Sequence, residues 1–103
     1  MNDKEIFIFG KPGCPKCAST KSMMAVKLPK WGVAADVTFF NTDDPQGRAR
    51  AAFYDVLEIP TTIVFLNGKE AARFVHQVPP SDGLKAALGV TTNDSLPQSS
   101  GPS

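Results

Sequence analysis

The stretch IFIFGKPGCPKC, residues 6–17, decides the fold, and it contains both cysteines of the chain. Its first four residues are all apolar, and a glycine and a proline follow them closely. This is the pattern of a short strand that is buried on both faces of a sheet. Pro15 favours the first position of a helix, where a missing backbone N–H costs nothing. The stretch therefore predicts a central strand followed by a helix that begins beside Cys14.

The totals indicate one globular domain. The chain has 103 residues, of which 42% are hydrophobic and 20% charged, an ordinary composition for a folded protein. We expect a single folded domain over residues 1–90 and a flexible tail over residues 91–103, where Ser, Pro, Asn and Gly dominate. The formal net charge of +1 gives no reason to expect nucleic acid as a partner. We expect a monomer.

The sequence also gives no sign of a membrane segment. Its apolar runs are far shorter than the roughly 20 residues that cross a bilayer. The first ten residues contain Asp3 and Glu5 and lack the basic start and the longer apolar region of a secretory signal. We therefore expect a cytoplasmic protein that has no membrane among its partners.

The first helix is expected over residues 15–27, because Pro29 would interrupt a helix that continued further. One side of this helix should face the core, and the residues on that side are Cys17, Thr20, Met24 and Leu28. A second strand is expected over residues 36–41, which are rich in β-branched and aromatic side chains.

A second helix is expected after Asp44, which suits an N-cap, and Pro45, which suits the first turn. Apolar residues then recur with the spacing of an amphipathic helix. We expect these residues to face the core: Ala49, Ala52, Phe53, Val56 and Leu57.

The last third of the chain predicts a hairpin and a short helix. Residues 61–66 and 69–75 read as antiparallel strands around Asn67-Gly68, the pair that most favours a two-residue turn. Ser81 is expected to cap the helix and Gly89 to end it. The inward residues of that helix should be Leu84, Ala87 and Leu88. The complete order is β-α-β-α-β-β-α, an α/β fold with right-handed crossovers.

The spacing of the two cysteines predicts a redox pair. Residues three apart on a helix have Cα atoms roughly 5 Å apart, a separation that a disulfide accepts. Cys14 should stand at the helix N-terminus, where unpaired N–H groups and the helix dipole stabilise a thiolate. Lys11 and Lys16 are close enough in sequence to add to that stabilisation. Cys17 should lie one turn inside the helix.

At these residues the chain resembles the thioredoxin superfamily, in which a CxxC motif follows the first strand and a proline opens the later hairpin, here within Ile59-Pro60-Thr61. The resemblance covers residues 4–88. It implies the thioredoxin fold, with a central mixed sheet and helices on both faces. It also implies a cis peptide bond before Pro60, which lies against the cysteine pair, and an Ile59 main chain that pairs with substrate.

The chain combines features of two branches of this superfamily. Lys11 is a basic residue three positions before the first cysteine, a feature in which the chain resembles glutaredoxins. The sequences of residues 41–43 and 59–69 resemble those of thioredoxins. Gly13 stands where thioredoxins carry a tryptophan, and Ile8 stands where they carry a buried aspartate. The segment Ala71-Ala72-Arg73 stands near the position where glutaredoxins have the Gly-Gly pair that helps hold glutathione.

The resemblance implies a thiol–disulfide oxidoreductase that reduces protein disulfides or glutathione-mixed disulfides. The thiolate of Cys14 is expected to attack the substrate disulfide, and Cys17 then to attack the Cys14 sulfur and release reduced substrate. The expected substrate-binding residues are Lys11, Pro15, Lys16, Ile59, Pro60 and Thr61. No tightly bound cofactor is expected, and glutathione or a thioredoxin-type reductase would serve as reductant.

Metal binding is the alternative reading, because a CxxC pair is also half of a zinc site. A structural zinc ion needs four ligands, and the chain has only two cysteines and one histidine, His76. Zinc or an iron–sulfur cluster shared between two chains would still be compatible with the pair. We expect His76 to be a surface or half-buried strand residue without a catalytic role, since thiol exchange needs only a thiolate.

Overall fold

The computed structural model describes residues 3–90 and confirms the expected order of elements. The elements are β1 (Lys4–Gly10), α1 (Pro15–Lys30), β2 (Asp36–Asn41), α2 (Pro45–Phe53), β3 (Thr61–Leu66), β4 (Lys69–Val75) and α3 (Ser81–Leu88). The tail expected over residues 91–103 lies outside the described residues. No helix in the described part of the chain is long and apolar enough to span a membrane.

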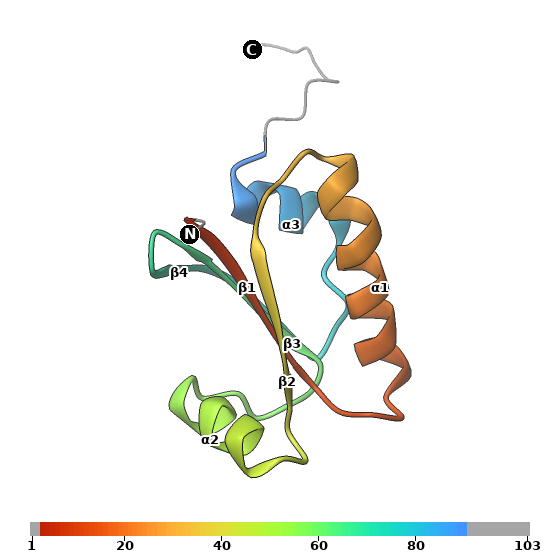
Figure 1. Ribbon diagram of the computed structural model, residues 1–103, viewed down its shortest axis with the longest axis vertical. Coiled ribbons are helices and arrows are strands. Elements are labelled where there is room, and N and C mark those ends of the chain that lie inside the picture. The colour runs from red at the N-terminus through yellow and green to blue at the C-terminus, as the bar shows by residue number, and fades with distance from the viewer. Residues whose placement is uncertain (1–2, 91–103) are drawn as a thin grey trace.

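The four strands form one mixed sheet in the order β2-β1-β3-β4 (Figure 1). β1 is central, as its apolar sequence predicts, and it pairs parallel with β2 and antiparallel with β3. β3 and β4 form the expected hairpin. Asn67 and Gly68 at its turn have φ angles of 53° and 81°, the positive values that a two-residue hairpin turn of this kind requires.

Helices cover both faces of the sheet (Figure 1). Because side chains alternate along a strand, Ile6 and Ile8 of β1 point to one face, and Phe7 and Phe9 point to the other. The first face packs against α1 and α3 through an aliphatic core: Ile6, Ile8, Met24, Leu28, Val64, Leu84 and Leu88. The second face packs against α2 and carries an aromatic cluster: Phe7, Phe9, Phe40, Tyr54 and Phe65.

The end expected for the first helix is wrong, because α1 continues through Pro29 to Lys30. Pro29 lies in the last turn, so its missing N–H removes a single intrahelical hydrogen bond. The turn is closed by other groups, since the N–H of Trp31 bonds to the Lys27 carbonyl at 2.9 Å and the N–H of Val33 bonds to the Leu28 carbonyl at 2.9 Å. The inward side of α1 is as expected: Cys17, Thr20, Met24 and Leu28 are buried.

The face expected for the second helix is also wrong. α2 ends at Phe53, and its buried residues are Gly47 and Ala51, whereas Phe53 is 76% exposed. A Cβ atom at Gly47 would collide with the main-chain carbonyl of Asn41. The missing side chain therefore lets α2 approach β2 closely along its Gly47 side, and the larger apolar residues turn outward. Ala49, Ala52 and Leu57 are exposed, and Val56 is half-buried.

The last helix starts differently from the expectation, although it ends as expected. Pro80, and not Ser81, is the N-cap of α3, and its carbonyl accepts the N–H of Leu84 at 2.9 Å. Pro80 suits this position because its φ of −67° and ψ of 143° are extended and a cap needs no N–H. Gly89 ends α3 in the left-handed conformation with a φ of 72°.

Candidate functional site

The site is built around a disulfide between Cys14 and Cys17 at the start of α1. Cys14 is the N-cap residue, Pro15 occupies the first turn, and the two cysteine Cα atoms are 5.2 Å apart. The backbone N–H of Cys17 donates to the Sγ of Cys14 at 3.2 Å. The sulfur of Cys14 thus receives one of the hydrogen-bond donors that every helix N-terminus leaves unpaired, which favours negative charge on it after reduction.

The two sulfurs differ in their access to solvent. Cys17 is 1% exposed and packs against β1, whereas Cys14 is half-buried and opens to the surface. A Cβ atom at Gly10 would lie 2.6 Å from the Sγ of Cys17, so only glycine permits this contact between β1 and α1. Gly10 is a site residue that the sequence signals only as the end of a strand. The less buried cysteine is the one suited to attack a disulfide, and the buried one to resolve the resulting mixed disulfide.

The loop between β1 and α1 holds Cys14 at the surface. Gly13 has a φ of 82°, in the left-handed region that favours glycine, and this turn directs the chain into α1. Lys11, Pro12 and Gly13 are all exposed, so this loop does not bury the sulfur. Lys16 is exposed in the first turn of α1. The two lysines that the sequence singles out therefore flank Cys14 along the chain.

The cis-proline loop meets the cysteine pair at the same end of the sheet. The Ile59–Pro60 peptide bond is cis, as the resemblance implies, and Pro60 is buried. Thr61 directly after it pairs with Phe9 of β1 in the antiparallel register. Pro60 therefore lies beside Gly10, the residue on which Cys17 packs.

The main chain on either side of Pro60 is fixed by hydrogen bonds, whereas that of Ile59 is not. The Pro60 carbonyl accepts the N–H of His76 at 2.8 Å, and the hydroxyl of Thr61 donates to the Glu58 carbonyl at 2.6 Å. Within residues 3–90, the N–H and C=O of Ile59 have no hydrogen-bond partner. Ile59 is half-buried and shares a hollow of about 470 Å³ with Lys11. The backbone N–H and C=O of Ile59 can therefore form hydrogen bonds with the main chain of a bound polypeptide.

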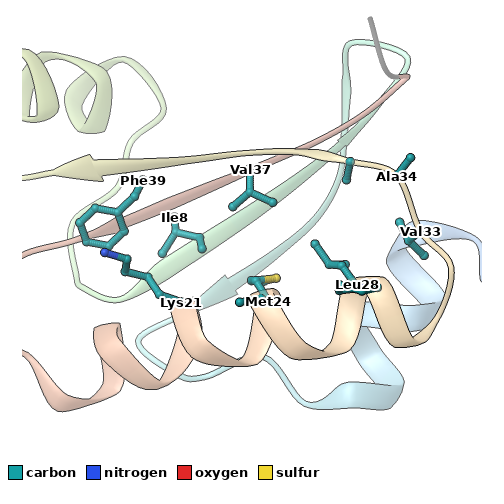
Figure 2. A pocket seen from close by; sticks show the side chains of 11 residues that line it. Ile8, Lys21, Met24, Leu28, Val33, Ala34, Val37 and Phe39 are labelled. Carbon is teal, nitrogen blue, oxygen red and sulfur yellow. The ribbon is translucent and has the colours of Figure 1, made fainter.

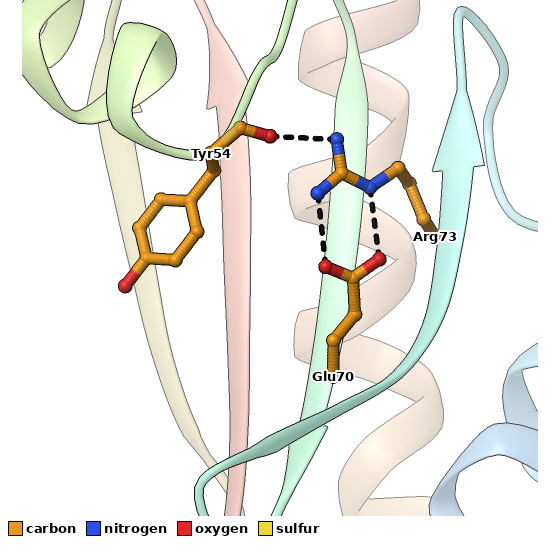
Figure 3. A network of polar contacts seen from close by, with 3 residues as sticks. All are labelled: Tyr54, Glu70 and Arg73. Carbon is orange, nitrogen blue, oxygen red and sulfur yellow. Dashed lines mark hydrogen bonds and ion pairs between the residues drawn. The ribbon is translucent and has the colours of Figure 1, made fainter.

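Arg73 on β4 contacts the start of the loop that runs from α2 to Pro60 (Figure 3). Arg73 donates through Nη1 to the Tyr54 carbonyl at 2.8 Å, and through Nε and Nη2 to the two carboxylate oxygens of Glu70, at 2.9 Å each. Hydrogen bonding from Arg73 lowers the pKa of Glu70, and the same bond raises the pKa of Arg73. Arg73 thereby links the β3–β4 hairpin to Tyr54, the residue that follows α2.

His76 also contacts this loop, which its place in the sequence does not reveal. It follows the last residue of β4 with a φ of 57°, and its Nδ1 lies 3.6 Å from the carboxylate of Glu58. Its side chain is 59% exposed, in agreement with the surface position expected for it. Among residues 3–90, no group of three or more His, Cys, Asp and Glu side chains lies close enough to hold a metal ion.

A second hollow is lined by residues of α1, β1 and β2 and of the segment between α1 and β2 (Figure 2). It measures about 570 Å³, lies between α1 and β2, and is lined mainly by apolar side chains such as Met24, Leu28 and Val37. The ammonium group of Lys21 lies 4.5 Å from the ring centroid of Phe39 at its edge. Neither cysteine lines this hollow.

Comparisons with known proteins agree with this architecture. No protein-family model and no curated protein matches the chain. Among solved structures, a mutant thioredoxin from Halobacterium salinarum NRC-1 is similar with a TM-score of 0.71 and 24% identity, over 93% of this chain and 80% of that one. Thioredoxin O2 from Arabidopsis thaliana in the oxidized state has a TM-score of 0.69 and 17% identity, over 84% and 72% of the two chains.

A third structure, thioredoxin-2 of a malaria parasite, has a TM-score of 0.71 and 20% identity, over 85% of this chain and 82% of that one. At these identities the likeness concerns the fold. The expected class, an α/β mixed sheet with helices on both faces, is confirmed, and so is the resemblance at the level of structure. With its CxxC disulfide at the start of the first helix, the chain adopts the thioredoxin fold.

Proposed function

We propose that this protein is a thiol–disulfide oxidoreductase that works through Cys14 and Cys17. The observation that carries the proposal is the pairing of one accessible and one buried sulfur at a helix N-terminus, beside the cis Pro60 loop. An inert structural disulfide needs neither the accessible sulfur nor the unpaired main chain of Ile59 next to it. The known thioredoxins with the same fold support the same reading.

The reaction starts from the reduced pair. The thiolate of Cys14 attacks one sulfur of the substrate disulfide, forming a mixed disulfide and releasing the other substrate sulfur as a thiolate, which takes up a proton. Cys17 then loses its proton and attacks the sulfur of Cys14. The Cys14–Cys17 disulfide forms and the second substrate thiol leaves. Two electrons have passed from the dithiol to the substrate.

The residues around the pair position the substrate. The N–H of Cys17 points at the Sγ of Cys14 and stabilises its charge when it acts as nucleophile or leaving group. The main chain of Ile59 adds a short strand-like pairing with the substrate backbone, beside the buried ring of Pro60. Pro15 and the lysines Lys11 and Lys16 complete the proposed binding surface. Thr61, which the sequence also suggested, is 1% exposed, and its hydroxyl donates to the Glu58 carbonyl, so its proposed role is to hold the cis-proline loop beneath that surface.

The proposal extends to how the protein is recycled. Protein disulfides or glutathione-mixed disulfides are the substrates, and a thioredoxin-type reductase or glutathione reduces Cys14–Cys17 again. The protein works as a monomer in the cytoplasm, without a tightly bound cofactor. Supplying each reductant separately and following reduction of the disulfide distinguishes the two routes.

Two cysteine variants test the proposed function. Cys14→Ser should lose disulfide reductase activity, because the accessible nucleophile is gone, and Cys17→Ser should accumulate a mixed disulfide, because nothing resolves it. Both are measured by reduction of insulin and by mass spectrometry of the trapped adduct. Full activity of Cys14→Ser would contradict the proposal. Metal analysis of protein purified without chelator tests the alternative, and a stoichiometric metal would favour it.

A further inference from the structure

One hydroxyl in the interior of the protein has no hydrogen-bond partner. Thr62 of β3 is fully buried, and within residues 3–90 its Oγ1 forms no hydrogen bond. Such groups are rare in folded proteins, because a buried polar atom without a partner has lost its hydration and gained nothing in return. Thr20 of α1 shows the usual arrangement, since it is buried as well and its hydroxyl donates to the Lys16 carbonyl at 2.8 Å. The unpaired hydroxyl of Thr62 therefore calls for an explanation.

The register of the sheet places Thr62 on the face that α1 covers. Thr62 lies directly opposite Ile8 of β1, which belongs to the aliphatic core beneath α1 and α3. Side chains that lie opposite each other in antiparallel strands share a face, so Thr62 points into the same core. Gly10, two residues after Ile8, lies on this face too, and a Cβ atom there would be 2.6 Å from the Sγ of Cys17. Thr62 is thus the diagonal neighbour of the glycine on which Cys17 packs.

The proposed reaction requires negative charge on a sulfur inside this core. Cys17 has to lose its proton in order to attack Cys14, and at 1% exposure its thiolate cannot be solvated by bulk water. A thiolate in apolar surroundings is destabilised unless a hydrogen-bond donor faces it. The buried side chains of this core are aliphatic or thioether groups, and among residues 3–90 the Thr62 hydroxyl is the buried side-chain oxygen left without a partner. Diagonal positions of neighbouring strands are about 7–8 Å apart, close enough for side chains to meet.

We propose that Thr62 is a positioning residue for the resolving step. This inference rests on the proposed function and deepens it. In the mixed disulfide, Cys17 is not bonded to Cys14, and its side chain can turn toward β3, where the hydroxyl of Thr62 donates a hydrogen bond to its sulfur. Cys17 then loses its proton and attacks the sulfur of Cys14. The Cys14–Cys17 bond forms, the bond from Cys14 to the substrate sulfur breaks, and the departing substrate thiolate takes up a proton. Thr62 remains a neutral donor throughout.

The same hydrogen bond favours the reduced pair. When the disulfide closes, the sulfur of Cys17 turns to Cys14 and the hydroxyl of Thr62 is left unpaired, as it is in this structure. The hydroxyl therefore stabilises the dithiol relative to the disulfide, which makes the disulfide easier to reduce. Removing the hydroxyl should slow the resolving step and also make the disulfide harder to reduce.

Thr62→Val tests both effects, because valine keeps the shape of the side chain and lacks the hydroxyl. Reduced protein is mixed with one equivalent of dithiobis(nitrobenzoate), which releases a coloured thiolate when Cys14 attacks and a second one when Cys17 resolves the adduct. In the variant the second phase should slow about tenfold, the effect of one hydrogen bond to a charged group, and the first should be unchanged. At equilibrium with dithiothreitol, its disulfide should be about three to ten times harder to reduce.

Two further variants separate the hydroxyl from the shape of the core. Thr62→Ser restores a hydroxyl on a smaller side chain and should recover most of the resolving rate. Thr20→Val is the matched control and should leave both phases unchanged, because the hydroxyl of Thr20 already bonds to the Lys16 carbonyl. Urea unfolding verifies that each variant is folded.

The inference is wrong if Thr62→Val resolves the adduct at the wild-type rate, if it slows both phases equally, or if Thr62→Ser is as slow as Thr62→Val. Each of these results leaves the proposed function standing, since both coloured thiolates are still released. A wild-type protein that forms the adduct and never resolves it, or that does not react at all, overturns both.

Discussion

The two cysteines show how far the environment of a single residue can separate chemically identical groups. Cys14 and Cys17 are three residues apart, and yet Cys14 is only half-buried, whereas Cys17 is buried against Gly10 of β1. The difference follows from their places on the helix, since the N-cap residue lies outside the first turn and the next cysteine points inward. The proposed division into attacking and resolving sulfur rests on that geometry.

This asymmetry predicts selective alkylation of the reduced protein. Iodoacetamide at neutral pH should modify Cys14 at least about tenfold faster than Cys17, because Cys14 is accessible and receives the Cys17 N–H, whereas Cys17 is 1% exposed. Peptide mapping by mass spectrometry over time measures the two rates. In urea the difference should disappear. Equal labelling of the folded protein would show that the helix start does not activate Cys14.

At the scale of elements, close approach decides where α2 lies. Gly47 brings the helix against the main chain of Asn41, and the apolar side chains at Phe53 and Leu57 turn toward solvent. Leu57 lines a hollow of about 470 Å³ that also contains Ile59 and Lys11.

Substituting Gly47 tests this placement. By helix propensity alone, Gly47→Ala should stabilise the protein by about 1 kcal/mol. We expect the opposite sign, a loss of about 1–3 kcal/mol, because the new Cβ would collide with the Asn41 carbonyl, which cannot rotate away. Urea unfolding measures the change. Ala49→Gly, at an exposed position of α2, is the control and should cost only the propensity difference of about 1 kcal/mol.

The stability that the Arg73–Glu70 ion pair adds to the fold should depend on pH. Its hydrogen bonds with Arg73 lower the pKa of Glu70 in the folded protein. A depressed carboxyl pKa stabilises the fold above the unfolded value of about 4.3, and this contribution is lost as the pH falls through the folded value. Since the pair is partly exposed, with side chains 27% and 39% accessible, we expect at most about 1 kcal/mol.

Comparing wild type with Glu70→Gln isolates that contribution. Urea unfolding at pH 7 should show wild type to be the more stable of the two, and the difference should shrink toward zero as the pH falls through the folded pKa of Glu70. A difference of the same size at neutral and at acidic pH would mean that Glu70 acts through packing and not through its charge.

At the scale of the whole molecule, one sheet separates two cores of different character. The α1 and α3 face is aliphatic, and the α2 face is aromatic, with rings such as Phe7 and Phe65 in edge contact at 4.9 Å between centroids. The cysteine pair lies where β1, β3, α1 and the cis-proline loop come together, so its geometry depends on both cores. The fold as a whole therefore holds the disulfide in place.

Oxidation should stabilise the whole fold modestly. Closing the short loop from Cys14 to Cys17 restricts the unfolded chain, and for so few residues the expected gain is about 2 kcal/mol. Urea unfolding of the oxidised and the reduced protein measures the difference directly. A reduced form that equals or exceeds the oxidised form in stability would indicate that the fold strongly favours the Cys14 thiolate, and that the protein acts as an oxidant of thiols.

The sequence by itself determined the order of the elements, the hairpin turn at Asn67-Gly68 and the cysteine pair at the start of a helix. These depend on neighbouring residues: apolar runs, turn dipeptides and Pro15 act over a few positions. The resemblance added the cis bond at Pro60, which periodicity could not reveal, because a peptide isomer leaves no pattern of its own.

Only the tertiary structure decided the side of α2 that meets the sheet, the continuation of α1 past Pro29, and the hollow that Ile59 and Leu57 share with Lys11. A periodic pattern shows that a helix has an apolar stripe, but it does not show whether another stripe of small residues fits the sheet more closely. Those choices depend on contacts between residues far apart in the chain, such as Gly47 with Asn41 across the α2–β2 contact and Gly10 with Cys17 across the β1–α1 contact.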